Sequence, residues 1–233
     1  MIDFANETFY SKIDRGGIGC IENLRFENCE FNNGGLSLTT SIDARTTVRN
    51  VELMNCRLNG CHCGPAIFED VSVSGLETND LVLLWGALFR RVTLRGSLGK
   101  FKLNLVVDAV DHSAKIQSPF DQFRERYYSE GVWALDIREA KFKEFEIRGI
   151  SSSLVLRNPE SQVVVTRERA LDEAWRDKVS PSNELWPFMI DMFLSDGEAD
   201  RVFVVPMNAP KKKRDTLMKQ LDELREAGVT IPD

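Results

Sequence analysis

The chain has 233 residues, of which 42% are hydrophobic and 28% charged, and its net charge is −6 at pH 7. This length holds one large domain, or one domain with a small appendage, and can bury a core. The acidic balance disfavours a general nucleic-acid binder, so we expect no direct nucleic-acid partner.

Export and membrane signals are missing from the sequence pattern. The first 17 residues, MIDFANETFYSKIDRGG, lack the features of a signal peptide, and the longest apolar run, Leu81–Phe89, is too short to cross a bilayer. Five cysteines are an odd number, so they cannot all pair within one chain. We therefore expect a cytoplasmic protein with free thiols, no membrane contact and no cofactor.

A five-residue period runs through residues 46–88. Every fifth residue is apolar, with Thr78 as the exception: Val48, Leu53, Leu58, Cys63, Phe68, Val73, Leu83 and Leu88. The residues two places earlier are apolar or small throughout. Two inward positions around one outward position indicate a short strand, because side chains alternate along a strand. Turn-forming residues separate the units, at Asn55, Asn59–Gly60, Gly64–Pro65, Asp70, Gly75 and Asn79–Asp80.

A longer period of about twenty residues contains the short one. The segments VRNVEL, FEDVSV and FRRVTL begin at residues 48, 68 and 89, and ALDIREAKFKEFEI continues the pattern further on. Four short sides for each long repeat predict a mainly β fold of stacked parallel strands.

This nesting resembles the pentapeptide-repeat family, in which the central residue of each unit is Leu or Phe and the residue two before it is small. Central matches are Leu53, Leu58, Phe68, Leu83 and Phe142, and small matches are Cys56, Cys61, Ala66 and Ala140. The resemblance implies a right-handed, four-sided parallel β-helix, a solenoid, over residues 1–165. The chain departs from this pattern in two ways: some small positions hold larger residues, and the phase breaks near 37–46, 89–92 and 106–133. A three-sided β-helix of the pectin-lyase type is therefore the alternative.

The segment 108–131 interrupts the repeat. Its stretch SPFDQFRERYYSEG predicts an inserted helix or loop, with Ser118 as the cap, Pro119 at the first helical position and Gly131 as the stop.

Residues 166–233 predict a separate C-terminal α/β or helical cap. TRERALDEAWRDKV and SNELWPFMIDMFLSDG have helical character, and RVFVVP reads as a strand. The segment after Asn208, the expected cap, is an amphipathic helix with Leu217, Leu221 and Leu224 on its apolar face and Gly228 as the stop. VTIP follows as a short strand, so strand, helix and strand predict a parallel pair. Such a unit suits the end of a β-helix, whose last strands need cover.

The stretch NGCHCG, residues 59–64, has the composition of a metal site. In the five-residue phase Cys61 and Cys63 point inward, stacked beneath Leu81 and Leu83, while His62 points outward. A zinc site needs side chains that converge on one point. Core packing of the two thiols is therefore favoured over a metal site.

Two surface features have more than one interpretation. Asp108, Asp111 and His112 are an acid–base cluster of the kind that a polysaccharide lyase or hydrolase uses. They also stand at a phase break, where loops are polar. PKKKR, at residues 210–214, has the composition of a nucleic-acid or nuclear-import patch, although a solvated basic face is the simpler interpretation.

An apolar outward face is the clearest interaction signal. Val82, Leu84, Trp85, Ala87 and Phe89 occupy positions that are polar and outward in the preceding repeats. Such a face must be covered, by the C-terminal unit, a second copy or a partner. We therefore expect a non-enzymatic protein-interaction module, which the resemblance extends to gyrase binding or toxin neutralisation, with a homodimer as an option. The alternative is a β-helix enzyme that acts on a polysaccharide.

Overall fold

The computed structural model of the protein describes residues 1–108, 110, 111 and 113–232. The described chain is mainly β, with one large parallel sheet, one two-stranded antiparallel sheet and four α-helices. The strands of the large sheet are β1 (Ile2–Ala5), β2 (Thr8–Tyr10), β3 (Cys20–Glu27), β4 (Glu30–Asn32), β5 (Gly35–Leu36), β6 (Thr47–Asn59), β7 (His62–Cys63), β8 (Ile67–Trp85), β9 (Leu88–Arg90), β10 (Val92–Asn104), β11 (Leu135–Asp136), β12 (Ala140–Glu146) and β13 (Val155–Leu156). The second sheet holds β14 (Gln162–Thr166) and β15 (Asp200–Val204).

The helices are α1 (Ala114–Tyr128), α2 (Arg167–Leu171), α3 (Leu185–Asp196) and α4 (Lys211–Ala227), with short 3-10 helices at Ile42–Ala44, Ser152–Leu154 and Glu173–Lys178. Within the described residues, none of them is both long enough and apolar enough to cross a membrane.

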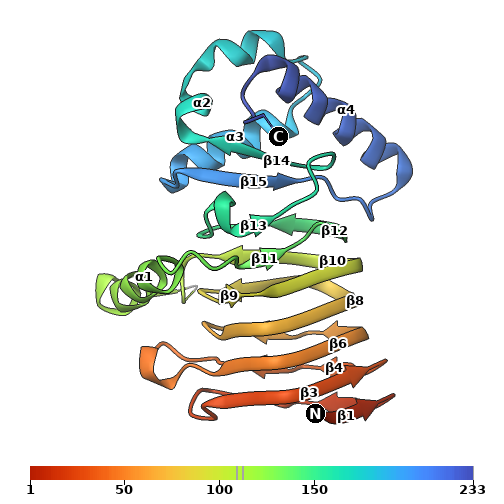
Figure 1. Cartoon of the computed structure of the whole chain (residues 1–233), viewed down its shortest axis with the longest axis vertical. Coiled ribbons are helices and arrows are strands. Elements are labelled where there is room, and N and C mark those ends of the chain that lie inside the picture. Colours follow the sequence, from red (N-terminus) through yellow and green to blue (C-terminus); the bar gives the residue numbers. More distant parts are fainter. Residues whose placement is uncertain (109, 112, 233) are drawn as a thin grey trace.

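The parallel strands lie one above the next along the long axis of the molecule (Figure 1). The central path of the sheet runs β1-β3-β6-β8-β10-β11-β13, and the other strands pair beside it. Thr47 lies opposite Ile67, and Leu135 lies opposite Val155, so both pairs join residues 20 positions apart. The predicted mainly β fold, its parallel pairing and its long period are thereby confirmed.

Four of the predicted turn residues, Asn55, Gly60, Asp70 and Gly75, adopt left-handed backbone conformations. Asn55 and Asp70 have φ angles of 51° and 54°, a region that Asn and Asp tolerate better than other side chains. Gly75 has a φ of 69°, and a Cβ added there would lie 2.7 Å from Asn55 Oδ1, so a larger residue is disfavoured at this turn. These turns separate the short strand segments within each repeat.

Strand β8 contains one residue more than the predicted phase allows. Leu58 lies opposite Thr78, which is 20 residues later, whereas Cys63 lies opposite Leu84, which is 21 residues later. The predicted stacking of Cys63 beneath Leu83 is therefore wrong. The extra residue lies between Thr78 and Leu84, within β8.

The same one-residue shift changes which side chains of the following apolar run point inward. In β10, Lys100 lies opposite Leu81 and Phe101 opposite Val82. Val82 is buried and Leu81 is exposed, so the predicted stacking of Cys61 beneath Leu81 is also wrong. The Lys100 ammonium must stay in water, and its neighbour in register therefore points outward as well.

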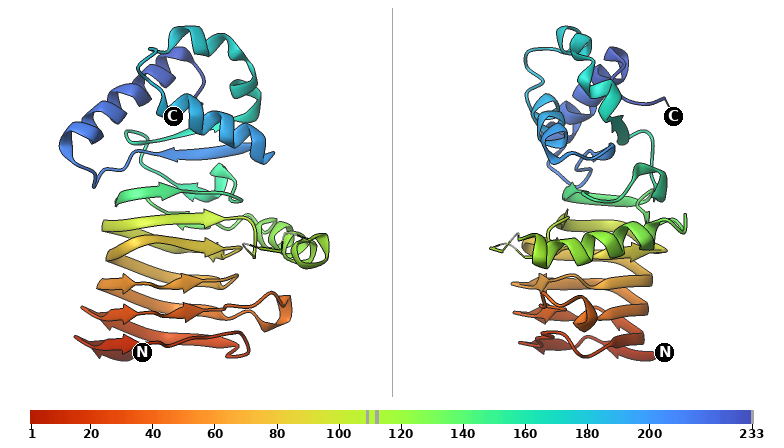
Figure 2. Two further views of the ribbon diagram at one scale, coloured as in Figure 1. Left: turned by 180° about the vertical axis from the view of Figure 1, so that it is seen from behind. Right: turned by 90° about the vertical axis from the view of Figure 1, so that its left-hand side faces the viewer.

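The inserted helix α1 is longer than predicted. Ser113 precedes its first turn, and Pro119 lies inside the helix, so the predicted start at Ser118 is wrong. Gly131, with a φ of 69°, follows the helix as predicted. The helix projects from one side of the strand stack (Figure 2). The loop before β6 reaches it there, and the Arg45 guanidinium lies 4.0 Å from the centre of the Phe123 ring.

The C-terminal sheet is antiparallel, so the predicted parallel pair is wrong. Val164 of β14 lies opposite Val202 of β15, and Thr230 of the expected last strand forms only a bridge to Val165, also antiparallel. Sequence reasoning missed β14, which supplies the shared partner strand. The amphipathic helix is confirmed as α4, with Leu217, Leu221 and Leu224 buried and Gly228 at its end with a φ of 84°.

Polar contacts join the C-terminal unit to the parallel sheet. Asn208 does not cap α4: its backbone N–H donates to Phe142 O at 2.9 Å, and its Nδ2 donates to Ser97 Oγ at 2.7 Å. Asp196 pairs with Arg148 at 3.2 Å, and Glu198 accepts the Gly149 N–H at 2.8 Å. The buried Arg201 pairs with both of these carboxylates at 2.7 Å. The C-terminal unit is therefore held over the end of the stack that contains β12 and β13.

Candidate functional site

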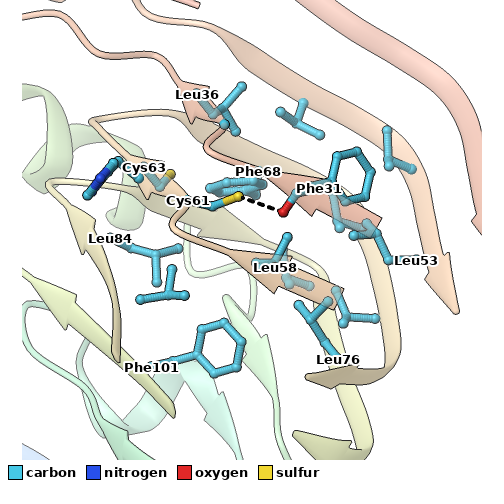
Figure 3. Close-up of a pocket in the computed structure, with 18 of the residues that line it drawn as sticks. Phe31, Leu36, Leu53, Leu58, Cys61, Cys63, Phe68, Leu76, Leu84 and Phe101 are labelled. Atoms are coloured by element: carbon cyan, nitrogen blue, oxygen red, sulfur yellow. Dashed lines mark hydrogen bonds between the residues drawn. The ribbon is translucent and has the colours of Figure 1, made fainter. Parts of the chain in front are cut away.

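The inward side chains of the parallel sheet enclose an apolar cavity of about 530 Å³. Figure 3 shows its wall, in which leucine and phenylalanine side chains from several strands point toward one another. One ladder of paired residues runs along it: Leu36 lies opposite Cys63, Cys63 opposite Leu84, and Leu84 opposite Leu103. The cavity therefore follows the stacking direction of the strands. Its volume lies within the range of small-molecule sites.

The repeat itself produces this hollow. Residues at the small position of the repeat, such as Cys56 and Ala66, are almost fully buried. Central positions such as Leu53, Leu58 and Phe68 point inward and line the cavity, yet they are only partly buried. An inward side chain that keeps exposed surface has empty space in front of it, because interiors are normally close-packed.

The two thiols of NGCHCG belong to this wall. Cys61 Sγ donates a hydrogen bond to Phe31 O at 3.3 Å, drawn in Figure 3, and Cys63 Sγ contacts Gly64 O at 3.4 Å. Burial raises the pKa of the Cys63 thiol to about 12, so it is an unreactive, protonated group at neutral pH. The predicted burial of Cys63 and exposure of His62 are confirmed, whereas Cys61 is only partly buried.

A metal centre has no support in the described residues. Among them, no group of three or more His, Cys, Asp or Glu side chains is placed to hold a metal ion. The alternation of the strand explains this locally, because Cys63 lies inside and His62 outside.

The cavity reaches the surface near the N-terminal strands. Among its lining residues, Lys12 and Ile18 lie before β3 and are exposed, so they mark its mouth. Asp14 also lines it, but that carboxylate accepts hydrogen bonds from Gly16 N at 2.8 Å and Ser37 N at 2.9 Å, and from the Thr46 hydroxyl. These hydrogen bonds hold Asp14, Ser37 and Thr46 together as a fixed corner beside the mouth.

The predicted apolar outward face is oriented differently. Val82 and Phe89 are buried, and Leu84 is half-buried, and all three line the cavity, so the prediction that they point outward is wrong. The extra residue in β8 is the reason. Trp85 and Ala87 are half-buried and do not line the cavity. A partner interface built from Val82, Leu84, Trp85 and Phe89 stays a prediction.

The candidate carboxylates lie in the loop between β10 and α1. Asp108 Oδ1 accepts the backbone N–H groups of Val110 and Asp111, and Asp111 Oδ1 accepts that of Ser113. Such bonds stabilise turns. His112 lies outside the described residues. Among the described residues of this loop, these contacts of Asp108 and Asp111 are those of a turn, and the polysaccharide-enzyme alternative stays a prediction.

Much of the basic surface is neutralised locally. Arg91 pairs with Asp70 at 2.5 Å, and Lys102 pairs with Glu146 at 2.9 Å. The lysines of PKKKR, residues 211–213, are exposed at the start of α4.

The chain matches no protein-family model, no curated protein and no solved structure at a significant level. Arguments about its function therefore rest on its own residues.

Proposed function

We propose that the parallel sheet is a right-handed parallel β-helix of the pentapeptide-repeat type, with a small α/β cap at its C-terminal end. The 20- and 21-residue offsets between paired strands support a repeating turn of the chain, as do left-handed turn residues between short straight segments. The chain divides, in this proposal, into a β-helix over residues 1–165 and an appendage over 166–233. Strand β14 crosses that boundary to pair with β15.

We propose further that the protein is a non-enzymatic scaffold that binds an extended segment of a partner protein at the edge of β1. The observation that carries this proposal is the strand pairing: β1 pairs with β3 on one side, and no other described strand lies on its opposite side. An uncovered strand edge is a template for a further strand.

The backbone geometry supports this edge as a binding surface. The Asn6 N–H donates to Glu27 O in the second layer at 2.9 Å. Because backbone groups alternate sides along a strand, the N–H and C=O of Ala5 face away from β3. They are available to an added strand.

The side chains beside this edge set the character of the partner. Phe4 stacks on Phe26 with ring centres 5.1 Å apart, and Phe9 stacks on Phe31 at the same spacing. An added strand with apolar side chains at alternate positions would continue these stacks. Ile2, at 62% exposed, adds apolar surface to the rim.

The charge distribution argues against binding to gyrase, because such binding would need an acidic, DNA-like surface. Arg49 pairs with Glu69 at 2.7 Å, and Arg57 pairs with Glu77 at 3.1 Å, each across neighbouring strands. The outward charges of these strands cancel in pairs. A strand-adding partner needs no acidic rod and is favoured for that reason.

The test is an edge-blocking substitution with a matched control. Ala5→Pro removes the outward N–H, whereas Ala5→Val keeps it and favours a strand. Affinity capture followed by mass spectrometry should recover one partner with the parent and with Ala5→Val, and lose it with Ala5→Pro. Circular dichroism and the melting temperature show that both variants fold. A partner that binds all three proteins equally would refute the edge proposal; a dimer that Ala5→Pro makes monomeric would identify the partner as a second copy.

A further inference from the structure

We propose that the cavity inside the parallel sheet binds a single-chain amphiphile of the fatty-acid class, with its acyl chain inside and its carboxylate at Lys12. This inference is independent of the partner-protein proposal, because it concerns the inside of the strand stack and not its edge.

The first argument is the wall of the cavity. Its volume is about 530 Å³, and the side chains that face it are almost all aliphatic or aromatic. Packed interiors contain few voids larger than a water molecule, and the free energy lost to a void grows with its volume. Water does not fill an apolar space of this kind, because it finds no hydrogen-bond partners there. An apolar guest would recover the lost contacts.

The second argument is the shape of the cavity. Leu36, Cys63, Leu84 and Leu103 line it in four successive layers. Neighbouring strands lie about 4.8 Å apart, so this part of the wall extends over roughly 14 Å. Phe145 of β12, which is paired with Phe101 of β10, continues the lining by one more layer. An apolar space that extends over several layers fits a flexible chain.

The third argument is the mouth. Lys12 and Ile18 line the cavity and are exposed, so a cationic residue and an apolar residue both lie where the cavity meets water. The nearby Asp14 carboxylate is directed to the Ser37 N–H and the Gly16 N–H and does not compete as a free anion. An ammonium at the end of an apolar space fits a chain that ends in a carboxylate.

The experiment uses the full chain, delipidated on a hydrophobic resin, and the fluorescent fatty acid cis-parinaric acid as the probe. We expect saturable binding of one probe per chain, and a higher melting temperature in its presence. Lys12→Gln should weaken binding of the acid about two- to fivefold, the range of an exposed ion pair, and leave binding of the methyl ester unchanged. Equal affinity of the parent for acid and ester would overturn the role of Lys12.

A filled cavity provides the decisive comparison. Leu58→Phe combined with Leu84→Phe adds two rings to the wall, and the repeat carries Phe at other central positions, such as Phe68. This double variant should bind the probe at least about tenfold more weakly. Leu171→Phe, an exposed site in α2, is the matched control and should bind like the parent. Failure of the folded parent to bind either probe, or equal binding by the filled variant, would overturn the proposal. If the double variant does not fold, the parent's melting-temperature shift with the probe decides.

Discussion

Replacement of Arg201 by methionine tests whether the ionic cluster holds the C-terminal unit on the parallel sheet. The Arg201 guanidinium is 2% exposed, pairs with Asp196 and Glu198 at 2.7 Å, and lies 5.3 Å from the Phe193 ring. Its Nη1 lies 3.9 Å from Glu146 Oε1 in β12. Methionine keeps the length and the contact with the ring. It removes the charge and, among the described residues, leaves Asp196 paired only with Arg148, at 3.2 Å, and Glu198 with only the Gly149 N–H, at 2.8 Å.

The expected loss of unfolding free energy follows from this burial. Breaking a buried ion pair by removing one partner costs about 3–5 kcal/mol. Because the side chains of Asp196 and Glu198 are 21% and 13% exposed, water screens part of the loss, and we expect the lower end, about 3 kcal/mol. For a chain of this size, 3 kcal/mol lowers the melting temperature by about 6–12 °C.

The control is Arg57→Met. Arg57 and Glu77 are paired at 3.1 Å, but their side chains are 55% and 63% exposed, so the expected loss is at most about 1 kcal/mol. Urea unfolding followed by tryptophan fluorescence provides the assay, because Trp175 and Trp186 are buried in the C-terminal unit and report on its release. Equal shifts of the unfolding midpoint for the two variants would refute the reasoning.

Four further predictions concern the reactivity and the titration of the thiols, the corner at the cavity mouth and a helix end. At pH 8, iodoacetamide should alkylate the exposed Cys20 and not Cys63; labelling of Cys63 in the folded protein, seen by peptide mapping, would contradict its burial. Because burial raises the pKa of Cys63 to about 12 in the folded protein, its contribution to stability is present below pH 9 and lost toward pH 12; Cys63→Ala should reduce this slope, to which the raised pKa values of Cys56, Tyr127 and Tyr128 also contribute. Asp14→Ala leaves the buried Ser37 N–H without an acceptor and should cost about 2–4 kcal/mol in urea unfolding, and an unchanged midpoint would argue against it. Gly228→Ala forces a side chain into the left-handed region at the end of α4 and should lower the unfolding free energy by about 1 kcal/mol; an equal or higher midpoint would contradict this.

The alternation of apolar and polar residues was sufficient to predict the parallel layers, but not the register after Thr78. In the run Leu81–Leu84 every residue is apolar, so both registers bury two leucine-sized side chains and the local pattern cannot choose. The choice is made by the next layer. Lys100 and Lys102 must reach water, so Phe101 points inward and aligns with Val82. A prediction that aligned GKFKL against LVLL would have found the correct register.

The cavity and the C-terminal pairing lay beyond the sequence pattern for different reasons. Whether Leu53 and Leu58 meet across the interior depends on side-chain volumes and on the width of each layer, which periodicity does not encode. Strand β14, with the sequence QVVVT, reads as one more strand of the repeat. Only its antiparallel pairing with β15, which follows two helices later, assigns it to the second sheet.

The two ends of the strand stack differ in chemistry, and this difference limits how the protein can assemble. At the C-terminal end, Arg201 and Asn208 connect the stack to an α/β unit through charged and polar contacts. At the opposite end, the described residues present a strand edge with the rings of Phe4 and Phe9 behind it. The α/β unit lies over the last strands at the C-terminal end, so the strand stacks of two copies cannot join end to end by pairing β1 of one with β13 of the other. Assembly through β1 is therefore limited to a strand supplied by a partner or by the β1 edge of a second copy.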